Sequence, residues 1–204
     1  FLVAILERKI AAVERKLVRA ETRLKKAEKR AGWKAALFEP DSLLALGSIY
    51  GIDILQDSLE IAKSRLFSLY KDAYRRIVEA EPPTDVLAAA RFILDRNILL
   101  GDAIHTHDEV SMQGVPGLDQ IVFTEWSRIG DEFKRREFRF DAMPMDGRAV
   151  DEEDARDGQL ELFPNDEPAH GVFKTDSGAS VFKPLPIREH PPTHYRNLAK
   201  RKGA

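Results

Sequence analysis

The feature that most constrains the fold is an unbroken series of apolar residues through the first 31 positions. The series alternates spacings of three and four, and its members are Val3, Leu6, Ile10, Val13, Leu17, Ala20, Leu24, Ala27 and Ala31. A mean period of about 3.5 residues is typical of a coiled-coil seam, whereas a helix on a globular core usually buries a wider stripe. The spacing therefore predicts an N-terminal coiled coil over residues 1–31.

Charged residues flank this seam in a regular way. One flank is acidic in every heptad (Glu7, Glu14, Glu21, Glu28) and the other is basic (Lys9, Lys16, Arg23, Arg30). In a parallel dimer each basic position faces the acidic position that follows it in the second copy. The expected pairs are Lys9 with Glu14, Lys16 with Glu21, and Arg23 with Glu28. The pattern predicts a parallel homodimer, and the alternative is a single amphipathic helix packed on its own chain.

The segment that follows, residues 33–142, has the pattern of a helical domain. A helix start is expected at Pro40-Asp41-Ser42, and apolar stripes at helical spacing predict helices over residues 55–80, 84–100 and 118–138. We find no sustained strand alternation in this segment. The expected fold class is therefore all-α: a coiled coil, a small helical bundle and a C-terminal tail.

Residues 143–204 form that tail, in which Gly, Pro, Asp and Glu dominate and apolar residues are isolated. Such a composition buries too little apolar surface to offset the entropy of ordering, so the tail is expected to be disordered. One stretch of it differs, because it reads Gln159-Leu160-Glu161-Leu162-Phe163 before Pro164. This pentapeptide resembles the motif by which bacterial replication and repair proteins dock on the DNA polymerase sliding clamp.

The chemistry of the pentapeptide suits capture by a partner. Three large apolar side chains lie in an acidic stretch that offers them no core, and Gln159 can both donate and accept hydrogen bonds. The resemblance implies that Gln159 occupies a small polar site on the clamp, while Leu160, Leu162 and Phe163 enter an adjoining apolar cleft. The alternative is that these residues fold back onto the chain's own helices.

Two further motifs carry possible chemistry. His105-Thr106-His107 has the spacing of metal ligands, but further ligands are lacking nearby, so a polar loop is the preferred interpretation. The C-terminal Lys200, Arg201 and Lys202 offer weak, salt-sensitive contact with DNA, or only a charged terminus.

Composition limits the remaining function classes. The chain has 32 Lys and Arg against 34 Asp and Glu, a net charge of -2, so a uniformly basic nucleic-acid binder is excluded. It has no cysteine, which fits a cytoplasmic protein and excludes thiol catalysis, and neither a cofactor motif nor an apolar run of membrane-spanning length occurs. The leading hypothesis is an accessory protein of bacterial or phage DNA replication or repair that docks on the sliding clamp. A coiled-coil scaffold with no DNA role is second, and a metal-dependent enzyme using His105 and His107 is third.

Overall fold

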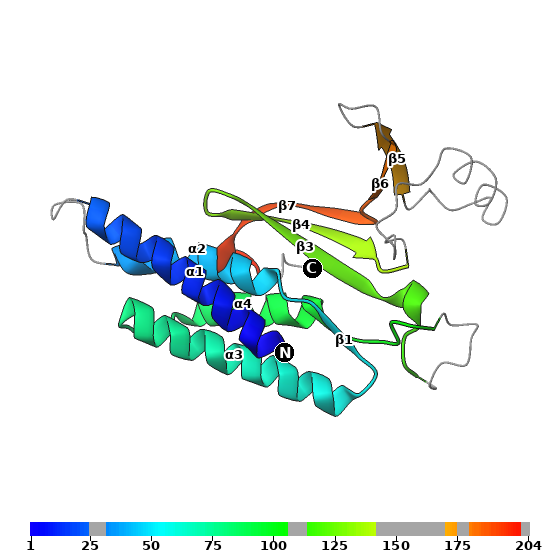
Figure 1. Ribbon diagram of the computed structural model, residues 1–204, viewed down its shortest axis with the longest axis horizontal. Helices are drawn as coiled ribbons and strands as arrows, with labels where there is room; N and C mark the ends of the chain where they lie inside the picture. Colours follow the sequence, from blue (N-terminus) through cyan, green and yellow to red (C-terminus); the bar gives the residue numbers. More distant parts are fainter. Residues whose placement is uncertain (25–31, 106–113, 142–169, 175–179, 201–204) are drawn as a thin grey trace.

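The computed structural model describes residues 1–24, 32–105, 114–141, 170–174 and 180–200 (Figure 1). Its helices are α1 (Leu2–Arg23), α2 (Trp33–Gly47), α3 (Gln56–Val78) and α4 (Thr84–Asn97), with the short 3-10 turns η2 (Leu118–Gln120) and η3 (Tyr195–Asn197). Its strands are β1 (Gly51–Asp53), β2 (Ile98–Leu100), β3 (Val122–Ile129), β4 (Glu132–Arg139), β5 (His170–Lys174), β6 (Ser180–Pro184) and β7 (Arg188–His194).

The main body has two layers, one of four helices and one of three strands (Figure 1). The antiparallel sheet has the order β3-β4-β7, and α2 and α4 contact its strand β3. Strands β1 and β2 pair in parallel beside the helices, and β5 pairs with β6 as a separate antiparallel ribbon. Because a sheet contributes a whole layer, the all-α prediction is wrong.

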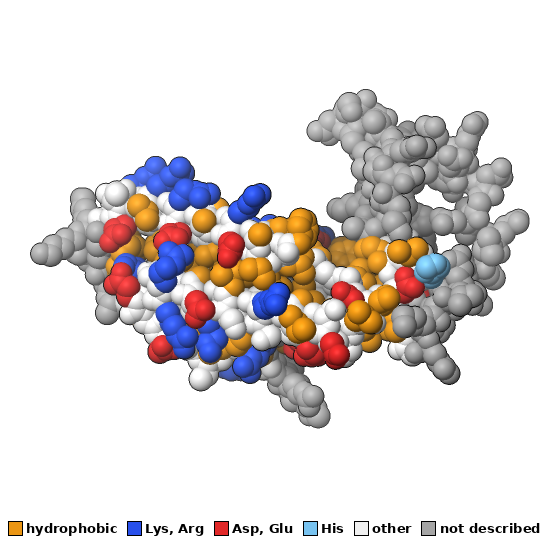
Figure 2. Space-filling model, turned by 60° about the horizontal axis from the view of Figure 1, so that its bottom comes forward, with side chains coloured by type: hydrophobic (Ala, Val, Ile, Leu, Met, Phe, Trp, Pro, Cys, Tyr) orange, Lys and Arg blue, Asp and Glu red, His pale blue; other side chains and the backbone are white. Residues whose placement is uncertain are grey.

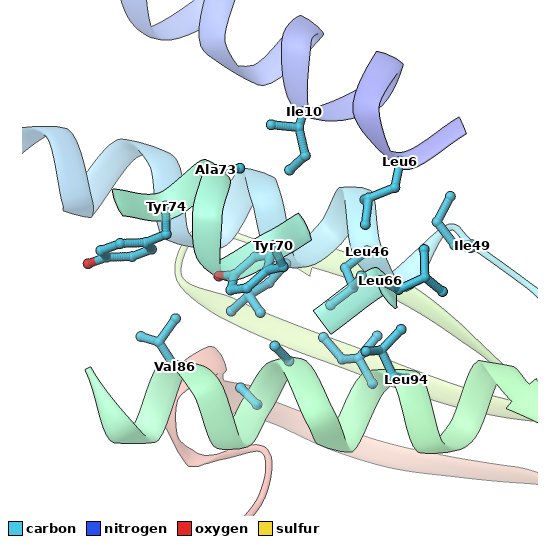
Figure 3. Close-up of a cluster of buried hydrophobic side chains, with 14 of the residues drawn as sticks. Leu6, Ile10, Leu46, Ile49, Leu66, Tyr70, Ala73, Tyr74, Val86 and Leu94 are labelled. Carbon is cyan, nitrogen blue, oxygen red and sulfur yellow. The ribbon is translucent and has the colours of Figure 1, made fainter. Parts of the chain in front are cut away.

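The core lies among the four helices, where each contributes one apolar stripe. Figure 3 shows Leu6 and Ile10 of α1 directed toward Leu46, Leu66 and Tyr70 of the neighbouring helices, and all five side chains are buried. At roughly 25 cal/mol for each Å² of apolar surface removed from water, each large side chain contributes about 1.5–3 kcal/mol to this core. The expectation of helices near residues 55–80 and 84–100 is confirmed by α3 and α4.

The helix expected over residues 118–138 is instead a β-hairpin. Strands β3 and β4 pair over their full length, from Val122 with Arg139 to Ile129 with Glu132. The two-residue turn between them has Gly130 at φ +62°, a left-handed conformation that glycine adopts without steric cost. A Gly-Asp pair that follows a run of aromatic and β-branched residues and precedes a run with phenylalanine near both ends is a hairpin signal that the apolar spacing obscured.

The N-terminal coiled coil of the predicted fold is also wrong, because the seam of α1 is filled by the chain itself. Leu6, Ile10 and Leu17 are buried against α2 and α3, and Val13 also packs on this core. The apolar face of α1 is therefore packed on its own chain, as the alternative of a single amphipathic helix expected. Pairing of two copies through this seam would require α1 to leave its own core.

Where the structure describes the C-terminal segment, at residues 170–174 and 180–200, it forms strands and a 3-10 turn, so the expectation of a disordered tail is wrong there. Strand β7 pairs with β4 on one edge of the sheet, and η3 follows it and packs on α4. Pro191 and Pro192 lie in β7 where the register with β4 shifts, between the pairs Phe133–Thr193 and Arg135–His190, and neither proline is paired. Proline is tolerated at such a bulge on an edge strand because no ladder hydrogen bond needs its missing N–H. The tail therefore returns to complete the sheet.

One buried junction joins the two layers. Asn97 at the end of α4 donates from Nδ2 to the Gly47 carbonyl (2.7 Å) and accepts at Oδ1 from the Trp126 indole Nε1 (3.0 Å). A Cβ atom on Gly47 would lie 3.0 Å from the Trp126 side chain, so a larger residue would require the indole to shift away from α2. A single side chain thereby links α2, α4 and β3.

Candidate functional site

The most unusual buried group is the carboxylate of Glu39. The apolar positions of α2 lie against the core, and Glu39 sits among them between Phe38 and Pro40 with no exposed surface. Burying a carboxylate costs several kcal/mol unless paired and hydrogen-bonded groups offset the lost hydration. The fold must therefore bring partners to it.

Three side chains from two distant segments supply those partners. The Tyr74 hydroxyl of α3 donates to Oε1 of Glu39 at 2.8 Å, and the Tyr195 hydroxyl of η3 donates to Oε2 at 2.8 Å. Arg196 donates to the same Oε2 from Nε at 3.1 Å and from Nη2 at 2.6 Å. Both carboxylate oxygens are thus satisfied, and α2, α3 and η3 meet at one charge. We call Glu39, Tyr74, Tyr195 and Arg196 the Glu39 cluster.

The protonation states of this cluster follow from its burial. Burial, followed by the hydrogen bond to Glu39, raises the pKa of Tyr74 above its ordinary value. Burial likewise raises the pKa of Tyr195, to about 12. Hydrogen bonding with Tyr195 and Glu39 raises the pKa of Arg196. At neutral pH both phenols are therefore neutral donors, and the guanidinium stays charged.

A cavity of about 500 Å³ opens beside the Glu39 cluster. It lies between the start of α2, the end of α3 and η3, and its walls include Trp33, Lys34, Val78, Pro83 and Arg196. The Lys34 ammonium is bound to Glu79 at 2.6 Å, and Arg196 also lies 3.6 Å from Asp85. Glu39 also borders the cavity, and of its four hydrogen bonds three go to Oε2 and one goes to Oε1. These hydrogen bonds anchor the C-terminal segment to the helices.

A second polar cluster lies between α4 and the sheet. Arg96 and Arg135 place their guanidinium carbons 3.4 and 5.4 Å from the centre of the Phe92 ring. Glu137 balances part of this charge, because its Oε1 lies 3.6 Å from Arg135 Nη2 and 2.9 Å from His190 Nε2. Burial lowers the pKa of both arginines, which stay charged at neutral pH because an arginine loses its proton only far above it. Through the cation–π contact of Arg135 with Phe92, this cluster is a second polar contact that joins α4 to the sheet.

Two of the charges predicted to pair two copies form ion pairs with other parts of the same chain. Lys16 Nζ lies 2.6 Å from Asp41 of α2, and Glu14 accepts from Arg76 of α3 at 2.6 Å. Of the other residues predicted to join two copies, Lys9, Glu21 and Leu24 are half-buried on α1 or at its end, and Arg23 is exposed. Glu28 lies outside the described residues.

The other predicted site residues are only partly described. Gln159, Leu160, Leu162 and Phe163 lie outside the described residues, as do His107, Arg201 and Lys202. Lys200 is exposed just after η3. His105 is partly exposed, and its Nδ1 lies 3.0 Å from Asp102 Oδ2. In the part of the chain that the structure describes, no three His, Asp or Glu residues are grouped so as to hold a metal ion.

Sequence reasoning missed the Glu39 cluster entirely. The sequence offered two weak signals. One was Glu39, an acidic residue inside an otherwise apolar helix, and the other was the Tyr195-Arg196 pair in the polar C-terminal segment. The two halves are more than 150 positions apart in the chain, and no local pattern connects them.

Comparisons with protein-family models, with curated proteins and with solved structures find no match to this chain. Among the helices of the described residues, none is both long and apolar enough to cross a membrane.

Proposed function

We propose that this protein is a cytoplasmic accessory factor of DNA replication or repair that docks on the polymerase sliding clamp through residues 159–163. The observation that carries the proposal is the sequence Gln159-Leu160-Glu161-Leu162-Phe163. Its three large apolar side chains can bind in an apolar pocket of a partner, and hydrogen bonds from the glutamine can fix the position of the peptide in that pocket.

The position of the pentapeptide in the chain supports this proposal. Strand β4 ends at Arg139 within the sheet, and β5 begins at His170, so the pentapeptide lies in a connection joined to described structure at both ends. Six residues separate Phe163 from His170. At no more than about 3.6 Å per extended step, the seven steps from Phe163 to His170 span at most about 25 Å. A clamp bound at the pentapeptide would therefore be held close to β5.

The experiment uses the full chain and purified bacterial sliding clamp, with a labelled peptide of residues 157–164 as a second probe. A lone short motif of this kind is expected to bind with a Kd near the micromolar range, about -8 kcal/mol. The double variant Gln159→Ala with Phe163→Ala should abolish binding of both probes.

The matched control is Asn165→Ala with Asp166→Ala, which changes two neighbouring residues outside the motif and should leave the affinity unchanged. Thermal unfolding of each variant checks that the folded body is intact. The proposal is refuted if the wild-type chain and peptide show no binding at high micromolar clamp, or if the motif variant binds as well as the wild type.

A further inference from the structure

The outward face of α1 carries a stripe of arginines. With about 100° of rotation per residue, Arg8, Arg15 and Arg19 fall within roughly 40° of one another on the helix. Leu6, Ile10 and Leu17, which are buried in the core, lie on the opposite side. The three arginines are exposed, and we call them the α1 arginine stripe.

These three guanidinium groups have no ion-pair partner in the part of the chain that the structure describes. Within the described residues, none of the three makes a side-chain ion pair or hydrogen bond, whereas Lys16 and Arg76 at the edges of the same helix are paired. Arg15, Arg19 and Arg23 also follow one another at four-residue spacing, so like charges adjoin on one face. Each such neighbouring pair costs an isolated helix about 0.2–0.5 kcal/mol. A polyanion placed against the stripe would remove that cost.

The surface around the stripe allows close approach. Small residues (Ala4, Ala11 and Ala12) share this side of the helix. A shallow groove of about 450 Å³ is lined by Ala11, Glu14, Arg15, Val18 and Arg19, and the charge of Glu14 is paired with Arg76. Figure 2 shows blue basic side chains gathered at the upper left, on the α1 side of the molecule. Arginine side chains at these positions project from the body with nothing large between them.

We propose that the α1 arginine stripe binds the phosphate backbone of duplex DNA without sequence preference. Along the helix axis Arg8 lies about 10 Å from Arg15, and Arg15 about 6 Å from Arg19, so the stripe is about 16 Å long. Duplex DNA carries one phosphate per about 1.7 Å of its axis, so each of the three guanidinium groups can reach a phosphate oxygen. Arginine suits this contact because its planar fork donates two hydrogen bonds to one phosphate.

The same geometry argues against a lipid surface. A membrane-surface helix buries its apolar face among acyl chains, and the apolar face of α1 is already buried against α2 and α3. The exposed large apolar side chains near the stripe are Phe1, which precedes the first turn, and Val18. They lie about 25 Å apart along the helix axis and so form no continuous apolar face. This proposal is independent of clamp docking, because the stripe and the pentapeptide are different parts of the chain.

The test measures binding of the full chain to a fluorescently labelled 20-bp duplex as salt is raised, with no clamp present. Three phosphate contacts predict that log K falls against log salt with a slope of about -2.7. Arg15→Gln should reduce the steepness of the slope by about 1 and weaken binding about tenfold at low salt. The triple variant at positions 8, 15 and 19 should lose measurable binding.

The matched control is Arg65→Gln, which removes one exposed arginine from α3 and should leave both slope and affinity unchanged. All these positions are exposed, and circular dichroism confirms that each variant is folded. The proposal is overturned if wild-type protein does not bind the duplex, if Arg65→Gln weakens binding as much as Arg15→Gln, or if the triple variant still binds. Tighter binding to vesicles rich in phosphatidylserine than to the duplex, lost in the triple variant, would also overturn it in favour of a membrane.

Discussion

Removing the Glu39 carboxylate should destabilise the protein far more than removing any surface carboxylate. In Glu39→Ala the hydroxyls of Tyr74 and Tyr195 lose their acceptor, and Arg196 loses its closest counter-ion. Each buried donor left unsatisfied costs about 1–3 kcal/mol, and breaking a buried ion pair from one side costs about 3–5 kcal/mol. These penalties overlap, and Arg196 is one-third exposed and can turn toward Asp85. We therefore expect a loss of about 3–5 kcal/mol in the free energy of unfolding.

Urea unfolding followed by tryptophan fluorescence measures this change. For a chain of this length each kcal/mol lowers Tm by about 2–4 °C, so a drop of about 6–20 °C should accompany it in thermal unfolding. The matched control is Glu189→Ala, which breaks the exposed ion pair with Lys134 and should cost less than about 1 kcal/mol.

The conservative variant Glu39→Gln separates charge from shape. The amide oxygen of the glutamine still accepts a hydrogen bond, but its NH₂ group faces other donors. The free energy of unfolding of this variant should therefore lie between those of the wild type and Glu39→Ala. A Glu39→Ala protein that loses no more free energy than the Glu189→Ala control would refute the role of the Glu39 cluster as the anchor of η3.

Three further outcomes follow from the packing. Burial raises the pKa of all four tyrosines, to about 12 for Tyr50 and Tyr195, so the folded state holds their protons above pH 10. The stability that these phenols contribute is fully present below the unfolded pKa of about 10 and, for Tyr50 and Tyr195, is lost as pH rises through about 12. Ultraviolet absorbance should show little tyrosinate at about pH 10.5, and half-ionised phenols there would contradict this. Asn97→Leu leaves the Trp126 indole without an acceptor and should cost about 1–3 kcal/mol with a changed fluorescence spectrum, and an unchanged spectrum would count against the junction. Gly130→Val places a β-branched residue in a left-handed turn and should lower Tm by several degrees through a cost of about 1–3 kcal/mol, whereas an unaltered Tm would exclude that turn.

Sequence reasoning predicted best where a local pattern was long and bounded. The apolar stripe of α3 runs for six turns and ends before Pro82 and Pro83, and Thr84 begins α4 on the other side. Both boundaries depend on the missing N–H and restricted φ of proline, which act without any tertiary contact. The start of α2 was placed too late, because Pro40 signals a first turn but here lies inside the helix.

The prediction was wrong for residues 118–138, where the same spacing of apolar residues fits either a helix or a β-hairpin. Ile121, Trp126, Ile129 and Phe133 suit a helical stripe, yet their β-hairpin is stabilised by β7, which comes about 50 residues later. Strand pairing at that separation depends on loop closure and on the burial of Trp126 against α2 and α4. Neither quantity can be read from a local window.

By itself the sequence determined that residues 1–24 form an amphipathic helix with an apolar seam and an arginine face, because side-chain spacing sets which residues share a side. Only the tertiary structure decided what covers that seam. The hydrophobic effect is non-directional, so α2 and α3 of the same chain can bury the seam as well as the helix of a second copy would. The same holds for Glu39, whose burial is tolerable only because Tyr195 and Arg196 arrive from the far end of the chain.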